Sequence, residues 1–232
     1  VSDGIIETPR HEQIMPDGCV DIIFNFENYN SGRQFHEIPE LVGTMTSLLE
    51  LYYLPGRIQM MGIRFAPGGI TAFTQIPVNE ITNRHVDLTQ TKTLFDADFH
   101  NRLPEMKNMQ ERVDYLNRYF VARLSKLFQI NPQIKHAVSL IRSTAGLLSV
   151  KQLAYEICLC ERQLERKFKA MIGISPKLFS NVVRFQAARQ YAKAHQTDSL
   201  YSIAIACGYH DHSHMHKEFR QLGKISPSDL FT

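Results

Sequence analysis

The chain of 232 residues lacks long apolar stretches and targeting signals. No apolar run approaches the roughly 18 residues that a membrane-spanning helix needs, and no secretory leader with a basic start and an apolar core is visible. Hydrophobic residues make up 44% of the chain and charged residues 21%, as in globular proteins. We therefore expect a soluble protein of two modest domains or one large one, without a membrane partner. The chain begins with Val1 rather than Met, which leaves open whether a leader or a first strand precedes it.

Cysteine is scarce, with only four in the chain. Cys158 and Cys160 are the one pair close in sequence, and their C-x-C spacing is not that of a zinc-finger framework. We therefore expect no bound metal. Free thiols in the reducing cytoplasm are the simplest interpretation.

Acidic residues are scarce in the second half of the chain. Residues 1–129 hold 12 basic and 16 acidic side chains, a net charge of −4, whereas residues 130–232 hold 14 and 7, a net charge of +7. This division predicts that the basic half faces a polyanion. An ordinary solvated surface is the alternative.

Two segments near the C-terminus share one pattern. Residues 168–176 read F-K-A-M-I-G-I-S-P, and residues 219–227 read F-R-Q-L-G-K-I-S-P. Each segment follows an apolar stripe at helical spacing and a short turn, so each ends the second helix of a predicted helix-turn-helix. A duplicated helix-turn-helix has few uses other than reading duplex DNA.

The first unit is predicted at residues 150–172. Its first helix starts at the capping box Ser149–Gln152, in which the side chains satisfy backbone donors. The turn falls at Cys158 and Leu159, and the second helix is the one that normally enters the major groove.

The second unit is predicted at residues 200–222. Gly208 supplies the positive φ that its turn requires, and Asp211 caps the second helix. Between the units, residues 176–194 keep a helical rhythm and form a strut of about 28 Å. Because one turn of DNA measures about 34 Å, two reading helices so joined could contact successive segments of the major groove.

Residues 130–232 as a whole resemble the AraC/XylS family of bacterial transcription regulators. The residues that carry the resemblance are Leu153, Ala154, Arg162, Leu164, Arg166, Phe168, Lys169, Gly173, Ser175, Pro176, Arg184, Ile203, Ala204, Cys207, Gly208, Tyr209, Asp211, Ser213, His214, Lys217, Phe219, Arg220, Ser226 and Pro227. The chain departs from the family at Cys160, where a Ser cap is usual, and at Lys224, where Gly is usual. The resemblance implies a sequence-specific, DNA-binding transcription regulator that also contacts RNA polymerase.

The outward positions of the two second helices predict the DNA contacts. The expected base-contacting residues are Arg162, Glu165, Arg166, His212, Ser213, His216 and Lys217. Arg pairs bidentately with guanine, and Glu accepts from cytosine; for Arg166 a phosphate contact is the alternative. The expected phosphate-contacting residues, which position the protein without reading sequence, are Lys151, Lys167, Lys169 and Arg220. The histidines at 210, 212, 214 and 216 fall in i, i+4 pairs rather than one cluster, so DNA contact or packing is expected of them instead of metal binding.

The acidic half reads as β-structure followed by a helix. Strands are expected at 20–26, 41–45, 49–54 and 58–65, bounded by turn residues. Residues 10–90 look like the small β-rich N-terminal domain of some family members, which implies a cupin-like half-barrel. The predicted fold class is therefore α+β: this half-barrel with linker helices, then an all-α domain of two helix-turn-helix units joined by a long helix. The expected domains are a sensor at 1–94, a helical linker or dimerisation region at 95–129, and the DNA-binding domain at 130–232.

Two questions about the acidic half stay open at the sequence level. The apolar stripe of the linker, which comprises Val113, Leu116, Phe120, Leu124 and Leu127, either forms a homodimer or packs on the β-domain. The resemblance implies that the β-domain senses a small molecule, and Asp21, Asn25 and Arg64 could point into a cavity. Arg64 could hold an anionic group; a structural ion pair or an outward-facing position is the alternative for each.

Two other classes of protein compete with the regulator. Cys19 and His85 could act as nucleophile and base of a DNA-associated enzyme. No G-x-S-x-G motif, P-loop, zinc cluster or alkyl-acceptor motif is present, so we expect neither an enzyme nor a cofactor. A protein-interaction module is the other alternative, and it would lack a steep salt dependence. The operator, the effector, the direction of control and the oligomeric state have no signature in the sequence.

Overall fold

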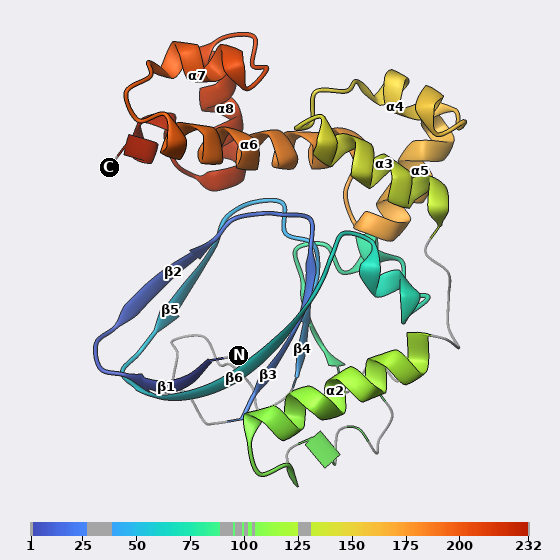
Figure 1. Ribbon diagram of the computed structural model, residues 1–232, viewed down its shortest axis with the longest axis vertical. Coiled ribbons are helices and arrows are strands. Elements are labelled where there is room, and N and C mark those ends of the chain that lie inside the picture. The colour runs from blue at the N-terminus through green and yellow to red at the C-terminus, as the bar shows by residue number, and fades with distance from the viewer. Residues whose placement is uncertain are drawn as a thin grey trace.

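The computed structural model describes residues 2–26, 39–88, 95, 99, 102–103, 105–124 and 131–231. A β-rich domain comes first along the chain, and a helical domain with two helix-turn-helix units follows it (Figure 1). The predicted α+β fold class is therefore confirmed. No helix in these ranges is both long and apolar enough to cross a membrane.

The β-domain contains two antiparallel sheets. The larger sheet has the strand order β1-β6-β3-β4-β7, with β1 at Ser2–Ile6, β3 at Val20–Asn25, β4 at Glu40–Val42, β6 at Gly56–Phe65 and β7 at His85–Asp87. The smaller sheet pairs β2, Arg10–Ile14, with β5, Leu49–Tyr53. The two sheets face each other as in a half-closed barrel (Figure 1).

The side chains of strand β3 alternate between the two faces of the larger sheet. Its residues at even positions, Val20, Ile22 and Phe24, are buried in the main core of the β-domain. Asp21 and Ile23 point to the opposite face, toward the smaller sheet. Alternation with a period of two is what a strand imposes on its side chains.

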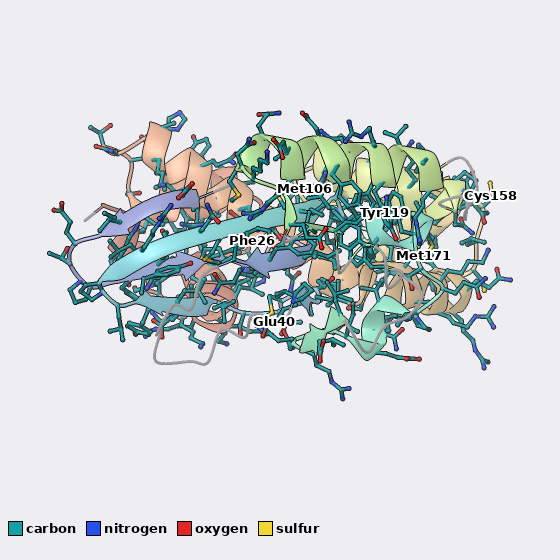
Figure 2. The ribbon with its side chains drawn as sticks, turned by 90° about the horizontal axis from the view of Figure 1, so that it is seen from below. Phe26, Glu40, Met106, Tyr119, Cys158 and Met171 are labelled. Atoms are coloured by element: carbon teal, nitrogen blue, oxygen red, sulfur yellow. The ribbon has the colours of Figure 1, made fainter. Side chains whose placement is uncertain are left out.

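The outer face of the larger sheet is covered by α2, which spans Met109–Leu124. Aromatic rings fill the space between them, and the rings of Phe95 and Phe99 stack with centroids 3.9 Å apart. Phe99 in turn meets Tyr119 of α2, with centroids 4.6 Å apart. In Figure 2, Tyr119 lies on the side of α2 that faces the sheet.

The apolar stripe of α2 packs mainly on this sheet. Leu116 is buried, and Val113 and Phe120 pack against the same core. Leu124 is 57% exposed, and Leu127 lies outside the described residues. Val113, Leu116 and Phe120 therefore pack on the β-domain, which is one of the two alternatives that the sequence left open.

The helical domain contains six α-helices in the described ranges and a closing 3-10 turn. They are α3 at Pro132–Ser143, α4 at Val150–Glu156, α5 at Glu161–Ile172, α6 at Pro176–Ala194, α7 at Leu200–Ala206, α8 at His212–Gly223, and η4 at Pro227–Phe231. The predicted signals of chain reversal and capping are present. Ser149 and Gln152 cap each other's backbone donors, Asp211 accepts the backbone N–H of His214 at 2.7 Å, and Gly208 has a φ of 74°.

The long helix α6 belongs to the cores of both helix-turn-helix units. Near its start, Phe179 packs against Phe168 of α5 with ring centroids 5.6 Å apart. Two turns later, Phe185 meets Phe219 of α8 edge to face at 4.8 Å. All four rings are fully buried, so α6 is the common wall of the two units.

Among the strands and α-helices of the described residues, four were not predicted from the sequence: β1, β2, β7 and α3. Strands β1 and β2 are mostly exposed, and neither carries the apolar alternation that marks a strand. Helix α3 does carry a signal, because Asn131 caps it and Pro132 occupies its first turn. The two departures from the family pattern are local, since α5 starts normally after Cys160 and Lys224 ends α8 in the left-handed conformation.

Candidate nucleic-acid interface and its neighbouring cavity

Helix α5 presents the first set of predicted base contacts on its outer face. Arg162 and Arg166 are exposed, and no hydrogen bond or ion pair engages either side chain within the described ranges. Glu165 lies between them on the same face, but its carboxylate pairs with Lys169 at 3.0 Å. The structure therefore brings the three residues together, with the two arginines free and the glutamate already paired.

Helix α8 presents the second set in its first two turns. The four predicted residues, His212, Ser213, His216 and Lys217, are all exposed. The helix begins at Asp211, and the hydrogen bond from the His214 N–H lowers the pKa of this carboxyl group. The cap therefore stays ionised, and it fixes the start of the helix from which these side chains project.

The predicted phosphate contacts differ in how far they are engaged within the protein. Lys151 and Arg220 are exposed and, among the described residues, make no ion pair. Lys167 donates to the side-chain oxygen of Gln133 at 3.2 Å, and Lys169 is held by Glu165 as described above. Lys151 and Arg220 are thus the two members of this set whose side chains make neither a hydrogen bond nor an ion pair among the described residues.

In the histidine-rich start of α8, His214 makes packing and hydrogen-bond contacts within the protein. His214 lies edge-on to the ring of Tyr209, with centroids 5.3 Å apart, and its Nδ1 accepts the backbone N–H of His210 at 3.3 Å. Across the described part of the chain, no group of three or more His, Cys, Asp or Glu side chains is placed to hold a metal ion.

The β-domain binds the C-terminal ends of α5 and α8. At the end of α5, the Thr44 hydroxyl donates to the carbonyl of Ile172 at 2.6 Å, and the Thr82 hydroxyl donates to the carbonyl of Gly173 at 2.8 Å. At the end of α8, the backbone N–H of Leu48 donates to the carbonyl of Leu222 at 2.7 Å. The last carbonyls of a helix have no partner within it, so the β-domain satisfies groups that would otherwise need water.

A further contact reaches the shared helix α6. The side-chain amide of Gln186 donates to the carbonyl of Pro16 at 2.8 Å, and Met15 packs against the core of the second unit. We define the segments 15–19 and 43–48 as the docking turns, because they contact α5, α6 and α8 of the helical domain. Since the C-terminal ends of α5 and α8 are held, their exposed first turns project away from the β-domain.

A cavity of about 300 Å³ lies between the two sheets of the β-domain. Most of its wall is apolar, and four of the lining residues are methionines. The apolar part comprises Ile14, Met15, Ile23, Val42, Met45, Leu49, Leu51, Tyr53, Met60 and Met61. Cavities of this size and lining are typical of small-molecule sites. Sequence reasoning missed this apolar part, although the alternation of Leu49, Leu51 and Tyr53 along β5 is a signal for it.

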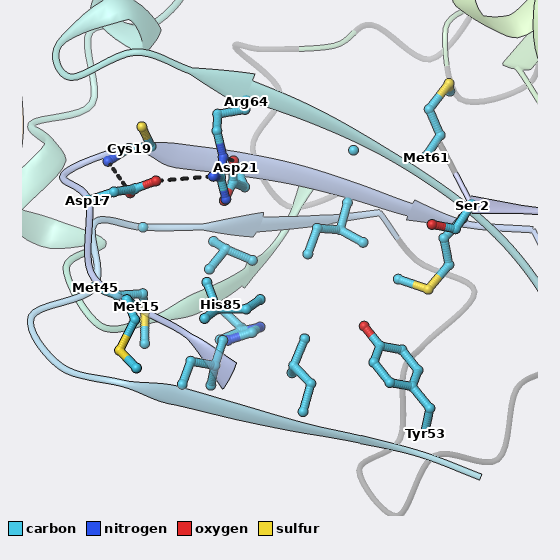
Figure 3. Close-up of a pocket in the computed structure, with 18 residues that line it drawn as sticks. Ser2, Met15, Asp17, Cys19, Asp21, Met45, Tyr53, Met61, Arg64 and His85 are labelled. Carbon is cyan, nitrogen blue, oxygen red and sulfur yellow. Dashed lines mark hydrogen bonds and ion pairs between the residues drawn. The ribbon is translucent and has the colours of Figure 1, made fainter. Parts of the chain in front are cut away.

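Charged residues gather at one end of the cavity, and Tyr53 lies toward the other (Figure 3). The Arg64 guanidinium is held by both oxygens of Asp21, each at 2.9 Å, and by Asp17 at 3.1 Å. These hydrogen bonds raise the pKa of Arg64 despite partial burial. Of the predicted effector-binding residues, Asp21 and Arg64 therefore line the cavity as a mutual ion pair, and Asn25 is buried outside its lining.

Cys19 and His85 both line the cavity, but the thiol is held in its protonated form. Burial, with a further contribution from the Asp17 charge, raises the pKa of Cys19 from 9.0 to about 12. The thiolate is the nucleophilic form of cysteine, so this thiol is poorly suited to covalent catalysis near neutral pH. His85 directs its Nδ1 to Glu40 at 3.0 Å. The arrangement weighs against the enzyme alternative.

Comparisons with known proteins match the two domains separately. A family model described as a helix-turn-helix domain matches residues 153–232. The transcriptional activator RhaS of Klebsiella pneumoniae is 32% identical over 80 residues, which are 34% of this chain and 28% of that protein. The transcriptional regulator CdhR of Pseudomonas aeruginosa is 31% identical over 119 residues, or 51% of this chain and 33% of that protein. Residues 153–232 are a helix-turn-helix domain of the AraC type.

The AraC-type domain is thus identified, and the β-domain is not. A family model described as a domain of unknown function matches residues 2–87. The matched part of this chain spans at most a third of the length of the two relatives named. The solved structure of ToxT from Vibrio cholerae aligns with 99% of this chain and 97% of its own, with a TM-score of 0.50 and 11% identity. At that identity the likeness shows a shared two-domain fold.

Proposed function

We propose that this protein is a transcription regulator that binds specific DNA through α5 and α8. The two helices enter successive segments of the major groove, with Arg162, Arg166 and the exposed face of α8 at the base edges. The AraC-type sequence of this domain and its net positive charge support this assignment. The cytoplasm is the proposed place of action, and contacts with RNA polymerase and a second copy of the chain are part of the proposal.

The observation that carries this proposal is the way the two reading helices are held. Both share α6 as a wall of their cores, and both end on the docking turns of one β-domain. Their first turns, which carry the exposed basic and polar side chains, are left uncovered. Reading helices in helix-turn-helix proteins contact base edges mainly through their N-terminal residues.

Control by a small molecule in the cavity is the second part of the proposal. Met15, Asp17 and Cys19 of one docking turn, and Gly43 and Met45 of the other, line the cavity. The intervening residues of the same turns carry the contacts to the helical domain. An occupant that shifts these turns changes the relative placement of α5 and α8, and with it the affinity for DNA.

The test is selection from random duplex DNA, followed by binding measurements on the enriched site. We expect an asymmetric site with two boxes about one helical turn apart. Replacing Arg166 or Lys217 with Ala should each weaken binding by about 1–3 kcal/mol if they contact bases. Arg142→Ala and Lys193→Ala are matched controls, since these exposed residues lie on α3 and at the end of α6.

Each contrary result has its own meaning. Enrichment of a single box would leave only one unit reading sequence. A steep salt dependence without enrichment would leave only non-specific DNA binding. If DNA binding is absent and the chain instead captures a protein with little salt dependence, the protein-interaction alternative replaces this proposal.

A further inference from the structure

The charged end of the cavity carries more negative than positive charge. Two carboxylates, Asp17 and Asp21, face one guanidinium, Arg64, so the group has a net charge of −1 when all three are ionised. Cys19 stays a neutral thiol beside them. His85, the one histidine in the lining, is already paired with the carboxylate of Glu40. No other lysine or arginine lines this cavity in the described part of the chain.

Hydrogen-bonding capacity is unbalanced in the same direction. An ionised carboxylate offers about four lone-pair sites, and Arg offers five donors. Arg64 spends three donors on Asp17 and Asp21, and Asp17 accepts in addition the backbone N–H of Cys19 at 2.9 Å. The two carboxylates together therefore keep more acceptor sites than Arg64 keeps donors. A ligand that donates fits the surplus better than one that accepts.

An anionic ligand meets an obstacle at this end. Arg64 is clamped by both oxygens of Asp21 on the neighbouring strand, because the two residues stand opposite each other in the β3–β6 register. A carboxylate ligand would have to displace Asp17 or Asp21 from the guanidinium, or lie beside two like charges. This geometry favours the structural ion pair, the alternative left open by the sequence, over an anionic ligand on Arg64.

The rest of the cavity suits a flexible or aromatic apolar body. Met15, Met45 and Met60 present adaptable thioether side chains. The ring of Tyr53 stands toward the far end, as Figure 3 shows. A molecule that fits has its polar group at the Asp17 and Asp21 end and its apolar part along the methionines.

We propose that the cavity binds an organic ammonium ion, with its nitrogen against Asp17 and Asp21 and its apolar body among the methionines. This inference names the class of ligand for the effector role proposed above, and it rests on that role. The ammonium N–H groups take the acceptor sites that Arg64 leaves unused, and the surplus negative charge is neutralised.

The test compares three probes of similar size on the full chain: 2-phenylethylammonium, 3-phenylpropionate and 3-phenylpropan-1-ol. Calorimetric titration should show the ammonium binding about tenfold or more tightly than the other two, which is the worth of one hydrogen bond to a charged group. Asp21→Asn should abolish this preference. Arg64→Gln should strengthen ammonium binding, since it releases both carboxylates. Asp3→Asn, on β1 outside the cavity lining, is the control and should change nothing.

Three results would overturn the proposed ligand class: tighter binding of the carboxylate, equal binding of all three probes, or no binding of the ammonium to the unaltered chain. All three are measured on the unaltered chain, so none depends on how a variant folds. Affinity for DNA with and without the ammonium probe is a separate measurement. A probe that binds in the cavity but leaves DNA affinity unchanged would support the ligand class and count against effector control.

Discussion

At the scale of single residues, a buried ion pair joins α6 and α8 inside the helical domain. Arg184 and Glu218 are 5% and 4% exposed, and Glu218 also accepts the hydroxyl proton of Tyr209 at 2.7 Å. The Arg184 guanidinium lies over the Tyr209 ring, 4.8 Å from its centroid. Removing one partner from such a pair leaves an uncompensated charge in the interior.

We therefore expect Glu218→Ala to lower the free energy of unfolding by about 3–5 kcal/mol. Urea denaturation of the full chain measures this loss. The control is Glu165→Ala, which breaks the exposed pair with Lys169 on α5 and should cost less than about 1 kcal/mol. Equal losses for the two variants would show that the buried pair contributes no more than the surface pair.

Cys19 leads to a prediction about pH. Its pKa is 9.0 in the unfolded chain and about 12 in the folded protein, so between these values the folded state holds a proton that the unfolded state has lost. The stabilisation from this thiol is complete below pH 9 and is lost as the pH rises toward 12. Cys19→Ser should therefore show a shallower fall in unfolding free energy over that range, measured by denaturation at several pH values.

Reactivity of the same thiol gives an independent check. At pH 8 a disulfide reagent should modify the exposed Cys158 and Cys160 quickly and leave Cys19 unmodified. Mass spectrometry after brief labelling distinguishes the sites. Rapid modification of Cys19 would contradict its raised pKa and revive the enzyme alternative.

At the scale of elements, the junction of α5 with the β-domain depends on one glycine. Gly173 ends α5 with a φ of 92°, and a Cβ there would lie 2.8 Å from the Thr82 hydroxyl and 3.1 Å from that of Thr44. A side chain at this position would be strained in the left-handed region and would also press on the hydroxyls that bind the helix end.

Gly173→Ala should accordingly destabilise the protein by more than about 1 kcal/mol and weaken specific DNA binding by loosening α5. Thermal unfolding and binding to the selected site measure the two effects. Gly4→Ala on the exposed strand β1 is the control, because nothing lies within 4 Å of a Cβ built there. A Gly173→Ala protein with unchanged stability would show that the junction tolerates an added methyl group.

Elements differ in how far the sequence predicts them, for local reasons. The bounds of α6 match the prediction, Pro176–Ala194, because Pro and a capping Ser mark its start and apolar spacing marks its length. Strands β1 and β2 lacked such a signal because most of their side chains are exposed, so no apolar alternation marks them. Strand β3 pairs with the equally distant β6, but its buried face gives it that alternation.

The candidate sites show the same limit. The outward faces of α5 and α8 follow from helical periodicity, and the side chains predicted there are mostly exposed. The placement of Asp21 and Arg64 at a cavity was expected, but their mutual pairing depends on strand register. Thr44, Thr82 and Gln186 bind backbone carbonyls of another domain, and nothing in the sequence distinguishes a hydroxyl or side-chain amide that has such a partner.

At the scale of the whole molecule, the separation of charge predicts how the affinity for DNA depends on salt concentration. The helical domain holds the positive excess, and Lys151 and Arg220 are exposed on it without ion-pair partners in the described ranges. If each contacts one phosphate, Lys151→Gln and Arg220→Gln should each reduce the slope of log affinity against log salt by about 1. Binding measured across a salt series gives the slope directly.

Two controls sharpen this measurement. Lys167→Gln should change the slope less, because Gln133 already holds its ammonium group. Lys107→Gln, exposed in the β-domain half of the chain, should leave the slope unchanged. Identical slopes for every variant would mean that the DNA backbone lies along a different surface.

The shared helix α6 has a consequence for the chain lengths that the fold can accept. Each residue added to a helix rotates the downstream part of the chain by about 100° and moves it by about 1.5 Å. One inserted residue in the middle of α6 would thus point α8 to another side of the DNA duplex, and four would restore its direction approximately but displace it by about 6 Å, nearly two base-pair steps. The number of residues in α6 therefore fixes the distance and the rotation between the two halves of the binding site. Substitutions on this helix can be absorbed, but insertions and deletions change which sites can be bound.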